Sequence, residues 1–214
     1  MLKKGIVFDL DGTLWDSTEN IVPAWNIVFR RHREIKFEIT LAAMRNLMGK
    51  MIPDIAAEVF PMFSTQHGLD IIDECSQEEI RYLSEQGGVL YPGLQKTLDA
   101  LREEYALYIV SNCQAGYIEA FLKFYKFTDY FNDMECSGRT AKPKGENIRL
   151  LIRRNNLTHA VYVGDTESDR DAAKAAGIPF ILAEYGFGRV HDSPYAIGRI
   201  SDLPSMVGSV FKSL

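Results

Sequence analysis

The most informative part of the chain is the stretch Gly5-Ile6-Val7-Phe8-Asp9-Leu10-Asp11-Gly12-Thr13-Leu14. Its apolar run, residues 6–8, predicts a fully buried strand, and this strand ends at two carboxylates, Asp9 and Asp11. Residues i and i+2 of a strand point to the same side, so both carboxylates are expected to face one site. Two like charges this close are unfavourable unless a cation or a proton relieves them. The stretch therefore predicts a Mg²⁺-dependent carboxylate site in which one aspartate acts as nucleophile.

The composition is that of an ordinary globular protein. Of 214 residues, 46% are hydrophobic and 25% are charged, and the formal net charge is −5, which argues against a nucleic-acid or anionic-membrane partner. No stretch approaches the roughly 18 apolar residues of a membrane span, and no apolar leader precedes the first strand, so the expected location is cytoplasmic. The cysteines Cys75, Cys113 and Cys136 show no metal-ligand spacing and are expected to be buried or idle thiols.

Two patterns of hydrophobic spacing divide the chain. Residues 16–85 show helical spacing without a strand signal, and from Gly87 onward buried strands alternate with helices, which is typical of a parallel sheet. We therefore expect a doubly wound α/β core of residues 1–15 and 84–214, with an all-helical cap at 16–83. The later strands are expected near residues 106–110, 134–136, 160–163 and 179–182.

Polar residues follow the predicted strands at the point where each one ends. Ser111 and Asn112 follow the strand at 106–110, and Asp165 follows the strand at 160–163, with Asp169 one helical turn further on. A basic loop at 139–145 leads into another helix. Because ligands bind outside the carboxyl ends of the strands in a doubly wound sheet, we expect these side chains to converge on one crevice.

This set of motifs resembles the haloacid dehalogenase superfamily of phosphotransferases. The motifs are D-x-D-G-T at residues 9–13, S-N at 111–112, a lysine at 142 or 144, and G-D-x-x-x-D at 164–169, in the family's order. The helical insert is similar to the cap of the phosphoglycolate phosphatase and β-phosphoglucomutase branch. The loop at 183–188 is similar to the aromatic-glycine loop of phosphoglycolate-phosphatase-like members. The resemblance implies a Rossmann-like core carrying a helical cap.

The resemblance also implies a role for each motif residue. Asp9 attacks phosphorus and forms an aspartyl phosphate, Asp11 is the general acid and base, and Ser111 with a loop lysine binds phosphate oxygens. Lys144 is preferred because it lies directly before the next helix, and Lys142 stays open as the alternative. The expected metal ligands for Mg²⁺ are Asp9, Asp11, Asp165 and Asp169, and the expected substrate-binding residues are Gly12, Thr13, Asn112 and Lys50.

The function expected from the residues and the resemblance is hydrolysis of a phosphomonoester. The substrate would be a small phosphorylated metabolite, with phosphoglycolate-phosphatase-like activity first. A β-phosphoglucomutase-like phosphomutase and a nucleotidase or pyrophosphatase are the nearer alternatives, and a binding protein without turnover is the more distant one. A dehalogenase is not expected, because those relatives lack the second aspartate of the first motif and Asp11 is present. The sequence makes no prediction about oligomeric state.

Overall fold

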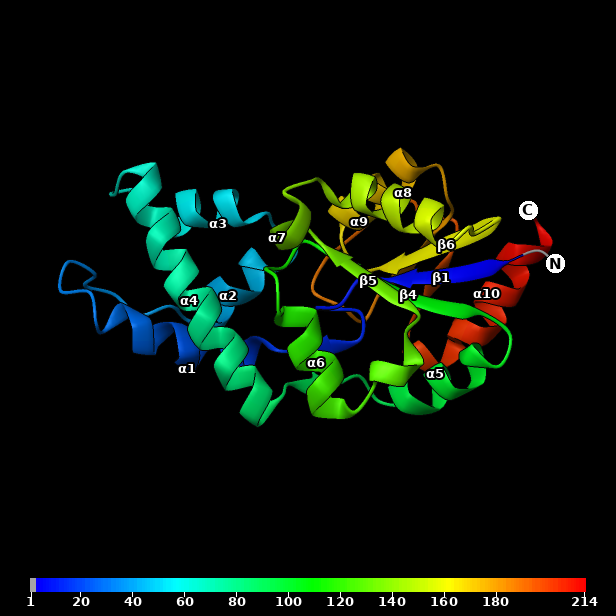
Figure 1. Cartoon of the computed structure of the whole chain (residues 1–214), viewed down its shortest axis with the longest axis horizontal. Helices are drawn as coiled ribbons and strands as arrows, with labels where there is room; N and C mark the ends of the chain where they lie inside the picture. The colour runs from blue at the N-terminus through cyan, green and yellow to red at the C-terminus, as the bar shows by residue number, and fades with distance from the viewer. Residues whose placement is uncertain (1–2) are drawn as a thin grey trace.

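The first predicted strand, β1 (Lys4–Phe8), lies inside a parallel sheet of six strands. The computed structural model describes residues 3–214 (Figure 1). The strand order is β5-β4-β1-β6-β7-β8, so β1 pairs with β4 on one side and with β6 on the other. The doubly wound α/β class is confirmed. The remaining strands of the sheet are β4 (Ala106–Ser111), β5 (Asp133–Cys136), β6 (His159–Gly164), β7 (Phe180–Ala183) and β8 (Ala196–Ile197).

Helices cover both faces of the sheet, which explains why its strands are continuous hydrophobic runs. Ile6 and Phe8 point to one face and Val7 to the other, as strand periodicity requires, and the two sides belong to separate hydrophobic clusters. Figure 1 shows α8 and α9 on one face and α5, α6 and α10 on the other. These helices are α5 (Leu94–Arg102), α6 (Tyr117–Tyr125), α8 (Lys144–Arg154), α9 (Glu167–Ala176) and α10 (Leu203–Lys212).

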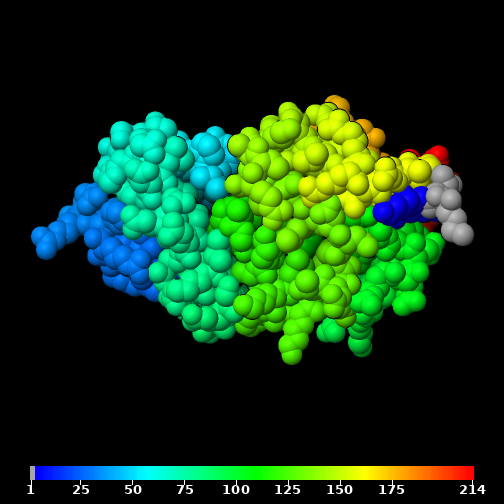
Figure 2. All heavy atoms as spheres, in the orientation of Figure 1, coloured from blue at the N-terminus to red at the C-terminus, as the bar shows by residue number. Residues whose placement is uncertain are grey.

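Four helices form a separate helical part at the end of the molecule remote from α10 (Figures 1 and 2). Thr40 and Ser64 cap two of them by accepting hydrogen bonds from the backbone N–H groups of Ala43 and His67, as N-cap hydroxyls do. Gly87, with φ +67°, ends the last helix. The helices are α1 (Thr18–Phe29), α2 (Leu41–Leu47), α3 (Ile52–Val59) and α4 (Thr65–Gln86). The division into a core at 1–15 and 84–214 and a cap at 16–83 remains a prediction, and its second boundary lies in the last turn of α4.

The structure adds a small element that hydrophobic periodicity does not predict. The two chain segments that join the helical part to the sheet part pair with each other as β2 (Trp15–Asp16) and β3 (Val89–Leu90), an antiparallel ladder of two residues per strand. A strand of two residues is too short to show an alternating pattern. The short elements between the larger ones are the helix α7 (Ser137–Thr140) and two 3₁₀ turns, at Thr128–Tyr130 and Ile200–Asp202. No helix among residues 3–214 is long and apolar enough to span a membrane.

Candidate active site

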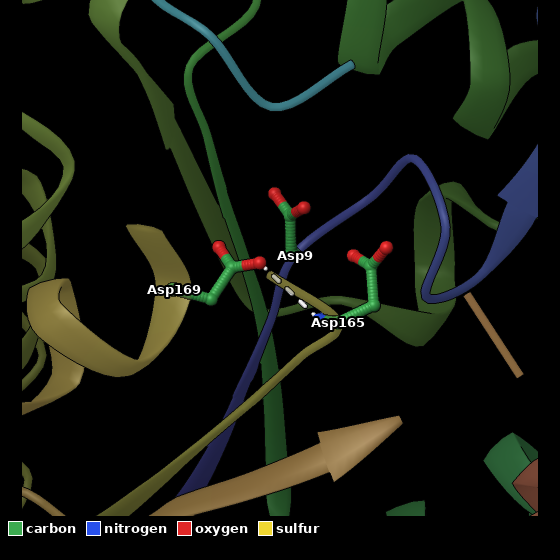
Figure 3. A group of neighbouring side chains, drawn as sticks. All are labelled: Asp9, Asp165 and Asp169. Carbon is green, nitrogen blue, oxygen red and sulfur yellow. Dashed lines mark hydrogen bonds between the residues drawn. The ribbon is translucent and has the colours of Figure 1, made fainter. Parts of the chain in front are cut away.

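Three buried aspartates converge at the carboxyl end of the sheet (Figure 3). Asp9 follows β1, Asp165 follows β6, and Asp169 lies in the first turn of α9. One oxygen from each carboxylate lies within 4.8 Å of the other two. From β1 the chain passes to β4 and then β5 on one side, and from β5 it crosses to β6 on the other side of β1. The aspartates that follow β1 and β6 therefore lie where the strand order of a doubly wound sheet reverses, which is where such sheets bind their ligands. The structure thus brings together three of the four predicted metal ligands.

Lys144 supplies the positive charge in this cluster. It is the first residue of α8, and its buried ammonium donates to Asp9 Oδ1 at 2.9 Å and to Asp169 Oδ1 at 2.6 Å. Burial lowers the pKa of Lys144, but the charges of Asp169 and Asp9 outweigh that effect and raise it. The ammonium is therefore permanently charged at neutral pH.

The cluster carries more negative charge than Lys144 can offset. Burial and the charge of Asp169 raise the pKa of Asp9 well above its usual range, although Lys144 opposes the shift. Burial, again with Asp169, raises the pKa of Asp165 to about 7. Three carboxylates beside one ammonium leave two negative charges uncompensated when all are ionised. A hard divalent cation with oxygen ligands, such as Mg²⁺, fits both this charge and this donor set.

The two candidate lysines are placed differently. Lys142 is exposed, and its backbone carbonyl accepts hydrogen bonds from Ser137 Oγ (2.9 Å) and Asn147 Nδ2 (3.2 Å). These hydrogen bonds to the main chain of Lys142 hold the loop before α8 in place, and the side chain of Lys142 takes no part in them. The structure brings Lys144 into the carboxylate cluster and leaves Lys142 outside it.

Asp165 is held by backbone groups from a distant loop. The N–H groups of Phe187 and Gly188 donate to Asp165 Oδ2 at 2.7 and 3.3 Å, and Thr13 Oγ1 lies 3.4 Å from Asp165 Oδ1. Gly12 has φ +80°, and a Cβ there would lie 2.2 Å from Asp165 Oδ2. Only glycine allows this backbone to pass so close to the carboxylate. Gly12 and Thr13 therefore contact a member of the cluster.

Asp169 has a structural role in addition to its place in the cluster. Its Oδ2 accepts from the backbone N–H of Thr166 at 3.0 Å and from Thr166 Oγ1 at 2.6 Å, while its own N–H donates to that hydroxyl oxygen. This reciprocal arrangement is a capping box at the start of α9. One carboxylate oxygen is thus used by the helix cap, and the other is held by Lys144.

Asp11, the fourth predicted metal ligand, is not a member of the three-aspartate cluster that the described residues form. Its Oδ1 accepts from Ser17 Oγ at 2.6 Å and from Tyr117 Oη at 2.8 Å. Burial raises the pKa of Asp11, and these two hydrogen bonds oppose the rise. Ser17 is the residue before α1, and its hydroxyl makes no helix-cap bond. Tyr117 belongs to no motif, so sequence reasoning missed it.

Ser111, Asn112 and Lys50 lie around a cavity between the sheet and the helical part. The cavity has a volume of about 60 Å³ and is lined by Asp9 and Asp11 as well as by these three residues. Asn112 Nδ2 donates a hydrogen bond to the backbone carbonyl of Gly49 at 2.9 Å. Asn112 therefore connects the end of β4 with the loop before α3. The Lys50 ammonium contacts the Glu58 carboxylate. The cavity connects the predicted catalytic residues with the helical part.

Comparison with known proteins agrees with this arrangement. The family model described as haloacid dehalogenase-like hydrolase matches residues 6–183. A phosphoglycolate phosphatase of Xylella fastidiosa is 30% identical over 196 residues, which cover 88% of this chain and 83% of the relative. One from Rhodobacter capsulatus is 29% identical over 188 residues, covering 85% and 84%.

Solved structures share the fold over nearly the whole chain. A predicted phosphatase from Clostridium acetobutylicum has a TM-score of 0.82 at 22% identity, covering 98% of this chain and 100% of that one. CbbY from Rhodobacter sphaeroides, solved in complex with phosphate, has a TM-score of 0.78 at 20% identity, covering 95% and 96%. The solved structures show only the fold, whereas the family model and the curated relatives also show the family. The chain belongs to the haloacid dehalogenase-like hydrolases and is an enzyme of the phosphatase class within that family.

Proposed function

We propose that the protein is a Mg²⁺-dependent phosphomonoester hydrolase that works through a phosphorylated Asp9. The observation that carries the proposal is the contact of the Lys144 ammonium with Asp9 and Asp169 beside Asp165. A phosphate dianion is repelled by an unshielded carboxylate, so a nucleophilic Asp9 needs positive charge nearby. Bound Mg²⁺ would be held by Asp9, Asp165 and Asp169 and would neutralise the negative charge of the substrate and of the site.

The proposed reaction has two steps. In the first, an Asp9 oxygen forms a bond to phosphorus in line with the ester oxygen, the ester P–O bond breaks, and protonated Asp11 gives its proton to the leaving oxygen. In the second, a water oxygen forms a bond to phosphorus, the bond between phosphorus and the Asp9 oxygen breaks, and Asp11 accepts a proton from the water, so that a free Asp9 carboxylate and inorganic phosphate result. The raised pKa of Asp11 suits a group that must start protonated. Positioning and charge stabilisation by Lys144 and Ser111 supply most of what phosphoryl transfer needs.

The proposed substrate is a small phosphorylated metabolite. The two curated relatives described above, which match most of the chain, are named phosphoglycolate phosphatases, so phosphoglycolate is the first compound to assay. The site opens into a cavity of about 60 Å³, which supports a compound of this size rather than a polymer.

The test is phosphate release from a panel of esters with Mg²⁺ and after chelation with EDTA. The panel contains phosphoglycolate, sugar phosphates, nucleoside monophosphates and pyrophosphate. We expect release from at least one small ester, lost on chelation and restored by Mg²⁺. Turnover that requires a sugar bisphosphate would indicate a phosphomutase instead, and Mg²⁺-independent release would contradict the proposal.

We expect Asp165→Asn to weaken the dependence on Mg²⁺ and the activity together. The variant keeps the shape of the side chain but removes a charged oxygen ligand, so the Mg²⁺ concentration at half-maximal activity should rise by roughly 10–100-fold. The measurement is phosphate release as a function of Mg²⁺ concentration. Glu167→Gln, an exposed acid two residues away, is the matched control and should titrate like the wild type. An unchanged Mg²⁺ titration in Asp165→Asn would rule out the ligand role.

A further inference from the structure

We propose that the leaving group of the substrate occupies the cavity beside Asp9 and Asp11, and that Glu79 selects a small leaving alcohol that carries a hydrogen-bond donor and no negative charge. The inference rests on the proposed hydrolysis at Asp9 and narrows its substrate to one chemical class. That class is a phosphate monoester of a short diol, polyol or amino alcohol. Nothing in the proposed hydrolysis itself uses Glu79.

The size of the cavity limits the leaving group. The cavity lies between the catalytic carboxylates and the helical part and measures about 60 Å³. A buried water needs roughly 10–15 Å³, so the space holds about four to six non-hydrogen atoms. A nucleoside is several times larger and does not fit this conformation.

Most of the cavity wall that the helical part provides is apolar. Side chains from all four of its helices contribute, among them Ile21, Trp25, Met44, Leu47, Ile55 and Ile72. In such surroundings an unpaired charge is strongly unfavourable, and a hydrogen bond is worth more than in water. The few polar groups in the wall therefore decide which leaving groups bind.

The charged groups of the wall disfavour an anionic leaving group. Asp9, Asp11 and Glu79 are acidic, and Lys50 is the one cation among the described residues that line the cavity. The Lys50 ammonium already contacts the carboxylate of Glu58. A carboxylate on the leaving group would bring another negative charge close to these acids without an uncommitted cation to balance it.

Glu79 is placed to accept a hydrogen bond from the leaving group. It lies on α4, is 6% exposed, and accepts from Trp25 Nε1 through Oε2 (2.6 Å) and from Gln114 Nε2 through Oε1 (3.2 Å). A carboxylate oxygen accepts two hydrogen bonds, so each oxygen keeps one free position. Burial raises the pKa of Glu79 to about 7. A donor on the leaving group stabilises the ionised form, whereas a carboxylate there is repelled by it.

A purely structural role of Glu79, in which it only anchors Trp25 and Gln114, makes a different prediction. Loss of an anchor changes the rates for all substrates by a similar factor. Recognition of the leaving group changes the ratio between substrates. The ratio of two kcat/KM values is therefore the informative readout, because it does not depend on how much active protein a variant yields.

The experiment compares three esters with leaving groups of similar size: 2-hydroxyethyl phosphate, phosphoethanolamine and phosphoglycolate. At pH 7.5 with Mg²⁺, we expect the wild type to have a kcat/KM at least about tenfold higher for the first two than for phosphoglycolate, because an unpaired buried charge discriminates by this much or more. Glu79→Gln should lower the ratio of phosphoethanolamine to phosphoglycolate by about tenfold or more. Gln114 can rotate its amide to accept from the new side chain, so the packing is kept.

Glu74→Gln is the matched control: it makes the same change on an exposed position of α4 and should leave the ratio at the wild-type value. A wild type that prefers phosphoglycolate, or a Glu79→Gln enzyme with an unchanged ratio, overturns the inference while leaving the proposed hydrolysis standing. The wild-type order of the three esters tests the inference even if the variant does not fold. If neither these esters nor p-nitrophenyl phosphate are hydrolysed, the proposed function fails and the inference fails with it.

Discussion

Asp9→Asn is expected to abolish phosphate release and to leave the fold intact. An amide oxygen is a much weaker nucleophile than a carboxylate, so the phosphorylated intermediate does not form. Removal of a covalent nucleophile lowers kcat by roughly 10⁴-fold or more. The measurement is phosphate release from the preferred ester at saturating Mg²⁺, with circular dichroism to verify the fold.

The stability of Asp9→Asn separates catalysis from structure. The pKa of Asp9 is raised above its unfolded value by burial and by Asp169, so at neutral pH its ionised form opposes folding in the metal-free protein. A neutral amide removes this repulsion, and we expect a metal-free melting temperature equal to or higher than that of the wild type. Asp54→Asn on the exposed side of α3 is the matched control and should keep full activity. Residual turnover above about one per cent of the wild-type rate would refute the nucleophile assignment.

The sequence predicts the parts of the site that depend on strand ends. An apolar run such as residues 6–8 identifies a buried strand, and alternation with helices makes the sheet parallel. Parallel strands present their carboxyl ends to one edge, so the convergence of Asp9 and Asp165 follows without knowledge of the packing. The structure confirms the expected fold for this reason.

The sequence cannot choose between two lysines that are only two positions apart. In the sequence, Lys142 and Lys144 both lie just before the predicted helix, and both have the charge that the site needs. The choice depends on where the helix begins: α8 starts at Lys144, which directs its side chain to Asp9 and Asp169, while Lys142 stays in the loop. Helix boundaries are the least certain part of a prediction from sequence, so the motif alone leaves both lysines open.

Contacts between distant side chains are also beyond sequence reasoning. Tyr117 reaches Asp11 across 106 positions of the chain, and neither helical spacing nor a motif distinguishes it from a core aromatic residue. Glu78 and Glu79 are adjacent acids on α4. Glu78 pairs with Arg31 and Arg81, whereas Glu79 is turned toward the cavity. Only the packing of α4 against α1 and α6 separates a surface ion pair from a cavity carboxylate.

Lys144→Ala is expected to lower both activity and stability strongly. The ammonium is buried between Asp9 and Asp169, and its loss leaves two buried carboxylates without their partner. Removing one side of a buried ion pair costs about 3–5 kcal/mol of unfolding free energy. Without Lys144 the pKa of Asp9 rises further, since that ammonium is one of the influences that lower it. A smaller fraction of Asp9 is then ionised and able to attack at any given pH.

The pH profile of activity separates the loss of stability from the change in the pKa of Asp9, because an enzyme that is only less stable keeps the pH profile of the wild type. At temperatures below the melting transition, the acidic limb of the kcat/KM profile of Lys144→Ala should move to higher pH. We also expect kcat at neutral pH to fall by roughly 10²-fold or more, which is the usual effect of removing a group that stabilises charge in the transition state. Lys142→Ala is the matched control two positions away, and since its exposed side chain lies outside the cluster, its rate, pH profile and melting temperature should stay close to wild type. Equal and small losses in the two variants would show that neither lysine binds phosphate. A large loss in Lys142→Ala alone would mean that the loop before α8 rearranges when substrate binds.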